Sequence, residues 1–239
     1  MSTEIFRYPT ALEAAEACGD RILALLNDAR QARGVAMLAI SGGSTPKLMF
    51  EWMARREFDW NGVQLFWVDE RMVPPGDTQS NYRMTRESLL NAIQIPAENV
   101  HRIAGESAPE EAAVAYIAEI RRVFGLNSNE LPVFDVLQRG MGPDMHTASL
   151  FPGEPLIENQ TDIAAAVWVE KMKQHRVTLL RGVLERARQT LCLVSGEDKA
   201  DALRSVLREP PDPMRRPSQI ESPAMAWYVD DAAYGADPS

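Results

Sequence analysis

Short continuous apolar runs alternate along the chain with segments in which apolar residues recur every three or four positions. The runs predict buried strands, at residues 35–40, 63–68, 134–137, 164–169, 177–180, 190–194 and 225–229. The periodic segments predict helices, at residues 11–32, 46–56, 80–93, 109–124, 181–188 and 197–207. Thr10 and Glu13 have the spacing of a capping box at the start of the first helix, and Gly34 follows its end.

Strand–helix alternation from end to end predicts an α/β fold with a mostly parallel sheet and helices on both faces. Residues 225–229 are expected to close that sheet. Neither a repeat nor a linker interrupts the pattern, so residues 1–239 are expected to form a single domain. An apolar content of 45% and a charged content of 25% fit a soluble globular protein.

The charge balance narrows the class of partner. The net charge is −9, from 25 basic and 34 acidic residues, and no Lys/Arg stripe offsets it, which argues against nucleic acid. No apolar run approaches the roughly 20 residues that span a bilayer, and the first residues do not resemble a signal peptide. The two cysteines, Cys18 and Cys192, lie far apart and outside any Cys-x-x-Cys pattern. A disulfide framework is therefore not expected, which fits a reducing compartment. We expect a cytoplasmic protein, monomeric or a small homo-oligomer, without a nucleic-acid or membrane partner.

A glycine-rich segment, Ser-Gly-Gly-Ser-Thr-Pro at residues 41–46, joins a predicted strand to a predicted helix, with Pro46 at the first helical position. Glycines allow the backbone to approach an anion, and a helix N-terminus adds positive potential. The candidate phosphate contacts are Gly42, Gly43, Ser44 and Thr45. The alternative is an ordinary capped turn.

A second glycine-rich segment, residues 140–153, follows the strand at 134–137 and is expected to open into a short helix. It places His146 two positions after Asp144. Histidine titrates near neutral pH and can accept and return a proton, and a nearby carboxylate can orient it. His146 is therefore the candidate general base. His101 and His175 have no metal-ligand spacing with it and are expected to be structural or solvated.

Charged residues at other strand ends complete the candidate site. Asp69 and Arg71 follow the strand at 63–68, where they could position a hydroxyl and stabilise an oxyanion, or form only a solvated cluster. Lys199 stands at a strand-to-helix junction and could bind phosphate; otherwise it would be solvated or paired with Glu197 or Asp201. Arg176, before the strand at 177–180, is a similar candidate.

Five segments in one order resemble the 6-phosphogluconolactonases and their superfamily with the glucosamine-6-phosphate deaminases. They are residues 41–46, Val-Asp-Glu-Arg at 68–71, Gly-x-Gly-x-Asp-x-His-Thr-Ala-Ser-Leu-Phe-Pro at 140–152, Ser-Gly-Glu-x-Lys-Ala at 195–200 and Trp-Tyr-Val-Asp at 227–230. The likeness extends over about residues 6–233, and the run Thr-Ala-Ser-Leu-Phe-Pro is typical of the lactonase branch.

The resemblance implies a Rossmann-like fold without metal or organic cofactor, acting on 6-phospho-D-glucono-1,5-lactone in the oxidative pentose phosphate pathway. By this resemblance His146 is the general base. Residues 42–45, Lys199 and Arg176 would bind the phosphate, and Asp69 and Arg71 would line the sugar site. Met145 stands where the family usually has glycine, and Gln138 and Arg139 stand where it has apolar residues. Met145 is therefore expected to strain the loop and to crowd His146.

Several alternatives stay open at this point. A sugar-phosphate isomerase or deaminase of the same superfamily would use Asp69 to move a proton. A sugar-phosphate-binding module with a decayed catalytic loop would bind without turnover, as would a generic phosphate-binding scaffold. A serine hydrolase would need Ser149 as its nucleophile, and His146 is the only evident base for it.

Overall fold

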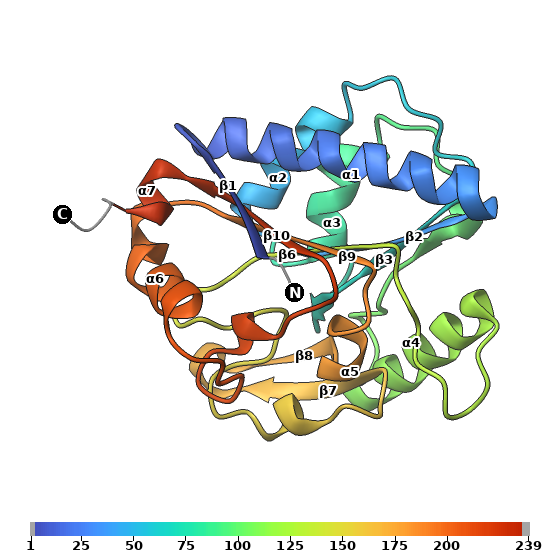
Figure 1. Cartoon of the computed structure of the whole chain (residues 1–239). Helices are drawn as coiled ribbons and strands as arrows, with labels where there is room; N and C mark the ends of the chain where they lie inside the picture. The colour runs from blue at the N-terminus through green and yellow to red at the C-terminus, as the bar shows by residue number, and fades with distance from the viewer. Residues whose placement is uncertain (1–2, 236–239) are drawn as a thin grey trace.

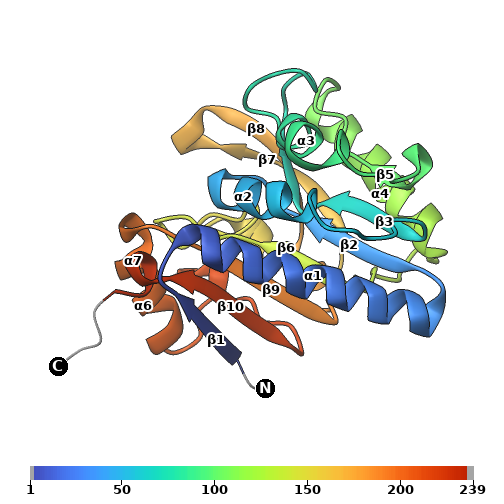
Figure 2. The same cartoon turned by 90° about the horizontal axis from the view of Figure 1, so that it is seen from above.

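A seven-stranded parallel sheet forms the centre of the protein in the computed structural model, which describes residues 3–235. The strand order is β1-β10-β9-β6-β2-β3-β5, and Figure 2 shows the strands fanning out in this order. Their bounds are β1 Thr3–Tyr8, β2 Ala36–Ile40, β3 Val63–Trp67, β5 Val100–His101, β6 Val136–Arg139, β9 Gln189–Val194 and β10 Met225–Asp230. Every neighbouring pair in this sheet is parallel, as the strand–helix alternation predicts.

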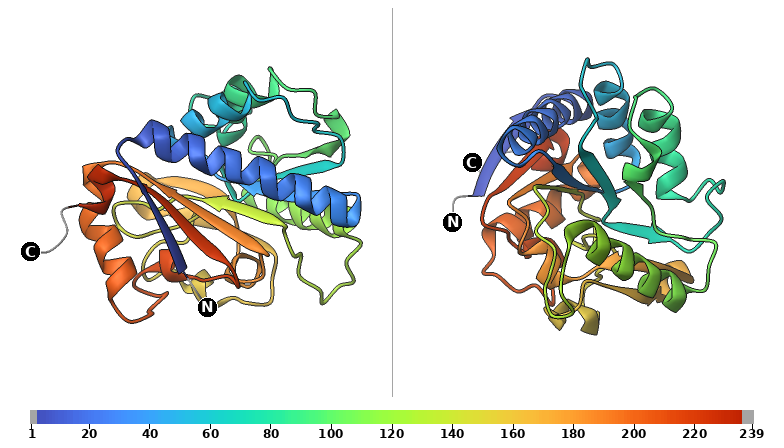
Figure 3. Two further views of the ribbon diagram at one scale, coloured as in Figure 1. Left: turned by 45° about the horizontal axis from the view of Figure 1, so that its top comes forward. Right: turned by 90° about the vertical axis from the view of Figure 1, so that its right-hand side faces the viewer.

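Helices cover both faces of the sheet (Figure 1). Their bounds are α1 Ala11–Arg33, α2 Ser44–Met53, α3 Asn81–Thr85 with a π-helical continuation Arg86–Leu90, α4 Pro109–Phe124, α5 Arg181–Leu184, α6 Ala200–Arg208 and α7 Asp231–Tyr234. Short 3-10 turns lie at Ala97–Asn99, Pro155–Glu158, Glu170–Met172, Glu197–Lys199 and Pro217–Gln219. The helices α1, α2 and α3 lie on one side, and α4 and α6 lie on the other (Figure 3). The predicted α/β architecture is confirmed.

The longest helix, α1, begins and ends where its sequence signals lie. Thr10 Oγ1 accepts a hydrogen bond from the Glu13 N–H at 3.2 Å and donates one to Glu13 Oε2 at 2.8 Å. At the other end Gly34, with φ of 77°, donates its N–H to the carbonyl of Arg30. These bonds satisfy backbone groups that a helix leaves unpaired at its ends.

A small antiparallel sheet packs beside the parallel one, in the order β4-β8-β7, with bounds Asp69–Arg71, Gln174–Leu179 and Ala164–Val169. The expectation that the strands at 164–169 and 177–180 extend the parallel sheet is wrong. Val169 pairs with Gln174, so only the turn at 170–173 separates the two strands. Parallel neighbours need a crossover of a dozen or more residues, which this turn cannot supply.

The parallel sheet ends at β1, so the expectation that residues 225–229 close it is also wrong: β10 is an internal strand. The sequence of β1 lacks a continuous apolar run because the strand lies at an edge, where side chains meet water. Ile5 and Phe6 remain 41% and 39% exposed, and Phe6 stacks on Tyr228 of β10.

Several boundaries differ from the predictions. The helix α2 spans Ser44–Met53 rather than 46–56, and α5 ends at Leu184 because residues 185–188 form a turn into β9. The helix expected at 80–93 ends at Leu90 with its second half π-helical, and the one expected at 197–207 starts with a 3-10 turn. The strand expected at 134–137 lies at Val136–Arg139. No helix in residues 3–235 has both the length and the apolar character needed to cross a membrane.

The order of the strands places a crevice between β2 and β6. From β2 the chain proceeds to β3 and β5 on one side, then returns to β6 and proceeds to β9 and β10 on the other. Open α/β sheets bind ligands at such a reversal, outside the carboxyl ends of the strands. The two glycine-rich segments follow β2 and β6, so both open into this crevice.

Candidate active site

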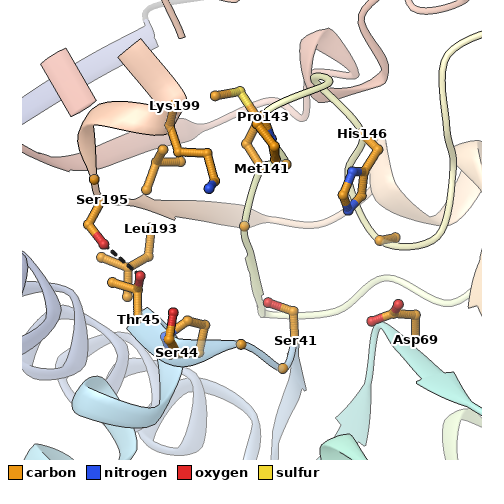
Figure 4. A pocket seen from close by; sticks show the side chains of 18 of the residues that line it. Ser41, Ser44, Thr45, Asp69, Met141, Pro143, His146, Leu193, Ser195 and Lys199 are labelled. Carbon is orange, nitrogen blue, oxygen red and sulfur yellow. Dashed lines mark hydrogen bonds between the residues drawn. The ribbon is translucent and has the colours of Figure 1, made fainter. Parts of the chain in front are cut away.

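A cavity of about 540 Å³ lies at the carboxyl ends of β2, β6 and β9 (Figure 4). Of the candidate residues, those that line it are Gly42, Gly43, Ser44, Thr45, Asp69, Arg71, His146, Arg176 and Lys199. Asp144 lies just behind His146 and contacts its ring. The structure therefore brings together side chains that lie more than 150 positions apart in the sequence, in a cavity with both cationic and acid–base groups.

The segment after β2 forms one end of the cavity. A Cβ at Gly42 would lie 1.8 Å from Asn81 Oδ1, so α3 can pack here only against glycine. The helix α2 has no side-chain cap at Gly43, which leaves N–H groups of its first turn available to an anion. Thr45 Oγ1 lies 2.6 Å from Ser195 Oγ, which joins this segment to the end of β9.

Lys199 lies at the same end of the cavity, where it immediately precedes α6. Its ammonium group pairs with Asp198, not with Glu197 or Asp201 as the sequence suggested. The side chain is 20% exposed. A partly buried cation, two hydroxyls and a helix N-terminus thus converge on one region, the combination that binds phosphate.

His146 lies at the opposite end of the cavity, near Asp69 (Figure 4). Its Nδ1 contacts Asp144 Oδ1 at 2.5 Å, and its ring stacks on Phe151 with centroids 4.2 Å apart. A Cβ at Gly142 would lie 2.1 Å from this ring, so the imidazole occupies space that only a glycine leaves open. With Nδ1 held in this way, Nε2 is the nitrogen that can exchange a proton with a ligand.

Asp144 uses both of its carboxylate oxygens. Oδ1 contacts His146, and Oδ2 lies 3.1 Å from Nζ of Lys171, on the turn between β7 and β8. Burial opposes the ionisation of Asp144, but the hydrogen bond and charge of His146 and the Lys171 ammonium hold its pKa below the usual range. The Asp144 carboxylate is therefore ionised in the folded protein at neutral pH.

The segment that carries His146 is not helical, contrary to the expectation. Met145 and Ala148 have φ of 66° and 53°, the left-handed region, and Thr147 forms a bridge with Leu150. Ser218 holds the turn from behind: its N–H and Oγ donate to the Met145 carbonyl at 3.0 and 2.9 Å. Its Oγ also lies 3.1 Å from the His146 carbonyl.

Met145 has the positive φ that glycine would adopt without strain. Its side chain, however, packs against the apolar cluster that contains Met141, Cys192 and Trp227, and it does not line the cavity. The expectation that Met145 crowds the place where substrate approaches His146 is therefore wrong. The strain that it adds to the loop is compensated by this packing and by the bonds from Ser218.

Successive side chains of β4 point to opposite sides of the strand, so Glu70 faces away from Asp69 and Arg71. Asp69 and Arg71 line the cavity, and the Arg71 guanidinium donates to the Gln79 carbonyl at 2.7 Å. Glu70 faces away and accepts the N–H groups of Asn81 and Tyr82, each at 2.8 Å, at the start of α3. Burial raises the pKa of the Glu70 carboxyl against the effect of these donors. The three charged residues of β4 are thus part of the structure of the site and do not form a solvated cluster.

Ser149 does not have His146 as its partner. Its hydroxyl is fully buried and donates to Asp69 Oδ2 at 2.6 Å, with Nη1 of Arg176 at 3.4 Å. Arg176 Nη1 also lies 3.7 Å from Asp69, and Asn81 donates to the Asp69 carbonyl. Ser149 therefore orients Asp69 and is not placed as a nucleophile, which removes the serine-hydrolase alternative.

Four contributions escaped the sequence reasoning. Phe151 stacks on the imidazole, Ser195 meets Thr45, and Lys171 pairs with Asp144. Gln138, buried in β6, accepts from both the N–H and the hydroxyl of Ser41 at 3.1 Å and so fixes the start of the segment after β2. Phe151 and Ser195 lie inside quoted motifs, but no local pattern identifies Lys171. Within residues 3–235, no cluster of His, Cys, Asp or Glu has the arrangement of a metal site.

Comparison with known proteins identifies the family to which the chain belongs. The family described as glucosamine-6-phosphate isomerases/6-phosphogluconolactonase matches residues 9–227. A 6-phosphogluconolactonase from Haemophilus influenzae is 36% identical over 203 residues, covering 82% of this chain and 85% of that protein. One from Nostoc is 33% identical over 241 residues, covering 100% of this chain and 98% of that protein. The structure of 6-phosphogluconolactonase from Thermotoga maritima superposes with a TM-score of 0.83 at 27% identity, covering 96% of this chain and 100% of that chain. The chain belongs to the 6-phosphogluconolactonase family, within the superfamily that includes the glucosamine-6-phosphate isomerases.

Proposed function

We propose that this protein hydrolyses 6-phospho-D-glucono-1,5-lactone to 6-phospho-D-gluconate, with His146 as general base and no metal or organic cofactor. The observation that carries the proposal is the division of the cavity into two ends. Thr45 and Lys199 lie at one end, and His146, oriented by Asp144, lies at the other. A phosphorylated sugar has its phosphate and its lactone carbonyl at opposite ends of the molecule, which matches this division.

The phosphate is assigned to the segment at residues 42–45 and to Lys199. Backbone N–H groups at the start of α2 and the Thr45 hydroxyl donate hydrogen bonds, and the Lys199 ammonium supplies charge. Asp198 neutralises Lys199 in the unliganded protein, so a phosphate competes with that carboxylate. Arg176, whose pKa is lowered by burial and by Arg71, contributes positive charge nearer to Asp69.

The chemistry is assigned to the other end. His146 Nε2 takes a proton from a water molecule as the water oxygen forms a bond to the lactone carbonyl carbon. Negative charge develops on the carbonyl oxygen, and Arg71 or nearby backbone N–H groups stabilise it. When the intermediate collapses, the bond to the ring oxygen breaks and His146 returns its proton to that oxygen. No covalent enzyme intermediate is needed.

The energetic demand on His146 is modest. Lactones hydrolyse slowly without a catalyst, and general-base catalysis contributes roughly 10²–10⁴-fold. Asp144 keeps the imidazole in the tautomer that accepts at Nε2 and stabilises the imidazolium that forms. Phe151 stacks on the ring and Gly142 leaves room for it, so the plane of the imidazole is already fixed. Little orientational entropy of the ring is therefore lost when substrate binds.

The test is a pH-stat assay on freshly generated 6-phosphogluconolactone. We expect acid release above the spontaneous rate, a fall of at least about 100-fold for His146→Gln, and little change for His175→Gln as the matched control. A His146→Gln variant within twofold of the parent would remove the general-base role. Ammonia release from glucosamine 6-phosphate, or ketose formation, would instead identify the isomerase or deaminase branch, and binding without turnover would identify a binding module.

A further inference from the structure

The turn between β7 and β8, at residues 170–173, contacts the segment that carries His146. Its residue Lys171 places Nζ 3.1 Å from Asp144 Oδ2, while the other oxygen of the same carboxylate contacts His146 Nδ1. The ammonium, the carboxylate and the imidazole therefore form a chain across two separate elements. Lys171 does not line the cavity, so it is outside the reach of the ligand assigned to that cavity.

We propose that Lys171 is a positioning residue that acts through Asp144, holding this carboxylate in place and offsetting part of the charge that the carboxylate presents to the imidazole of His146. The proposal rests on the assigned role of His146 as general base. An ionised carboxylate beside an imidazole favours the protonated ring, which cannot act as a base. A cation on the far oxygen weakens that effect while leaving the orienting hydrogen bond intact.

Other charged groups line the same cavity as His146. Asp69 and Arg71 come from β4, Arg176 from β8, and Asp198 and Lys199 from the turn that precedes α6. A ligand in the cavity would contact these groups directly. Lys171 differs because its side chain is 62% exposed and its partner lies behind the imidazole. Its contribution is thus separable from ligand binding.

The turn does not need Lys171 for its own structure. Glu170 pairs with Lys173 and accepts from the Trp168 indole N–H at 2.7 Å, and Lys173 has the left-handed φ of 50° that reverses the chain. The strands on either side continue pairing up to Val169 and Gln174. A change at residue 171 is therefore expected to leave the hairpin folded. Lys173, two positions further along, does not contact Asp144, so Lys173→Met is the control for a disturbed turn: it removes the pair with Glu170 and should leave the acid limb in place.

The experiment compares Lys171→Met, Lys171→Glu, Lys171→Arg and the control Lys173→Met by the pH dependence of kcat/KM. Removing the cation should move the midpoint of the acid limb upward by about 0.3–0.6 pH unit, the size expected for one charge at a solvent-exposed site. Activity on that limb then falls about 2–4-fold, with the alkaline plateau and KM unchanged. Lys171→Glu should shift the limb further, Lys171→Arg should restore it, and added salt should reduce the difference.

A second readout separates this proposal from the assigned activity. NMR titration of the His146 ring in the parent and in Lys171→Met reports the same shift whether or not the lactone is turned over. An unchanged titration and an unchanged acid limb would overturn the proposal. So would a rise in KM at every pH, since that outcome would make Lys171 a ligand contact. If Lys171→Met shows the titration shift relative to the parent while the parent has no lactonase activity, the assigned function alone is overturned.

Discussion

Replacing Arg139 by methionine is expected to stabilise the protein, although it removes a charged residue from the middle of the sheet. Arg139 lies at the end of β6 and is only 1% exposed. Its Nη2 donates to the Ile220 carbonyl and lies 3.7 Å from Met225 Sδ, whereas Nε and Nη1 have no hydrogen-bond partner. The Cys192 thiol is a further neighbour: burial raises its pKa, and the Arg139 guanidinium opposes that shift. The ion pairs within residues 3–235 include none with Arg139. The guanidinium is thus buried with most of its donors unused.

The magnitude follows from what each state leaves unsatisfied. A buried donor without a partner costs about 1–3 kcal/mol, and Arg139 has two such nitrogens. Methionine leaves one acceptor unpaired instead, the Ile220 carbonyl, at a similar cost, and it keeps the apolar stem in contact with Met225. Replacing a buried ion pair by apolar groups of similar volume is often neutral or stabilising by about 1–4 kcal/mol, and Arg139 lacks even the partner that offsets its desolvation. We expect Arg139→Met to raise the free energy of unfolding by about 1–3 kcal/mol, or Tm by about 3–9 °C.

The assay is urea and thermal unfolding of Arg139→Met beside Arg216→Met. Arg216 is also buried, at 8% exposure, but its donors reach Glu209, Pro210 and Gln219, so its loss should destabilise. If both variants lose stability to the same degree, the buried guanidinium at residue 139 is satisfied and the reasoning is refuted. An increase for Arg139→Met alone would confirm that the orphaned donors carry a cost.

Three further outcomes follow from the site and its surroundings. Thr45→Ala and Lys199→Ala should raise KM for the phosphorylated lactone by roughly 10–100-fold, the worth of a hydrogen bond to a charged group, and leave turnover of unphosphorylated gluconolactone unchanged; equal losses on both lactones would contradict the phosphate assignment. Met145→Gly should leave kcat/KM within about twofold, because relief of about 1–2 kcal/mol of left-handed strain is offset by lost packing; a tenfold rise would mean that Met145 impairs the loop. Burial lowers the pKa of His101 in the folded state, with Glu119 opposing the shift, so the unfolded chain binds a proton first as the pH falls below about 6.5. Folding stability should therefore decrease from pH 7.5 to 5.5, and His101→Gln should show a smaller decrease in urea unfolding over the same interval.

The sequence contains enough information to place the central strands and the site at their ends. Buried parallel strands are apolar on both faces, so β2, β3, β9 and β10 appear as largely apolar runs. Only Val136 and Leu137 indicate β6, because this strand ends in Gln138 and Arg139. Because the carboxyl ends of these strands meet at one edge, residues 42–45, His146 and Lys199 could be expected in one cavity. The edge strand β1 could not be found in this way, because Glu4 and Arg7 interrupt its apolar pattern where it faces water.

What the sequence could not supply are the contacts made between distant segments. The left-handed residues Met145 and Ala148 replace an expected helix because Ser218 and the apolar cluster hold the loop from outside. The partner of Ser149 is Asp69, which lies in β4 of the small antiparallel sheet. Lys171 contacts Asp144 only because the hairpin of β7 and β8 packs against the loop that carries His146. None of these pairings leaves a local pattern, since each depends on the packing of whole elements.

The bonds from Ser218 to the backbone of Met145 and His146 have a consequence for the order in which the protein matures during synthesis. They join positions 73 and 72 residues apart, and the acceptor loop precedes the donor. A nascent chain that has emerged only as far as β9 has the histidine, its carboxylate and the phosphate segment, but lacks the strap that fixes the loop around them. We therefore expect catalytic competence late in translation, after the segment around residue 218 has left the ribosome and docked.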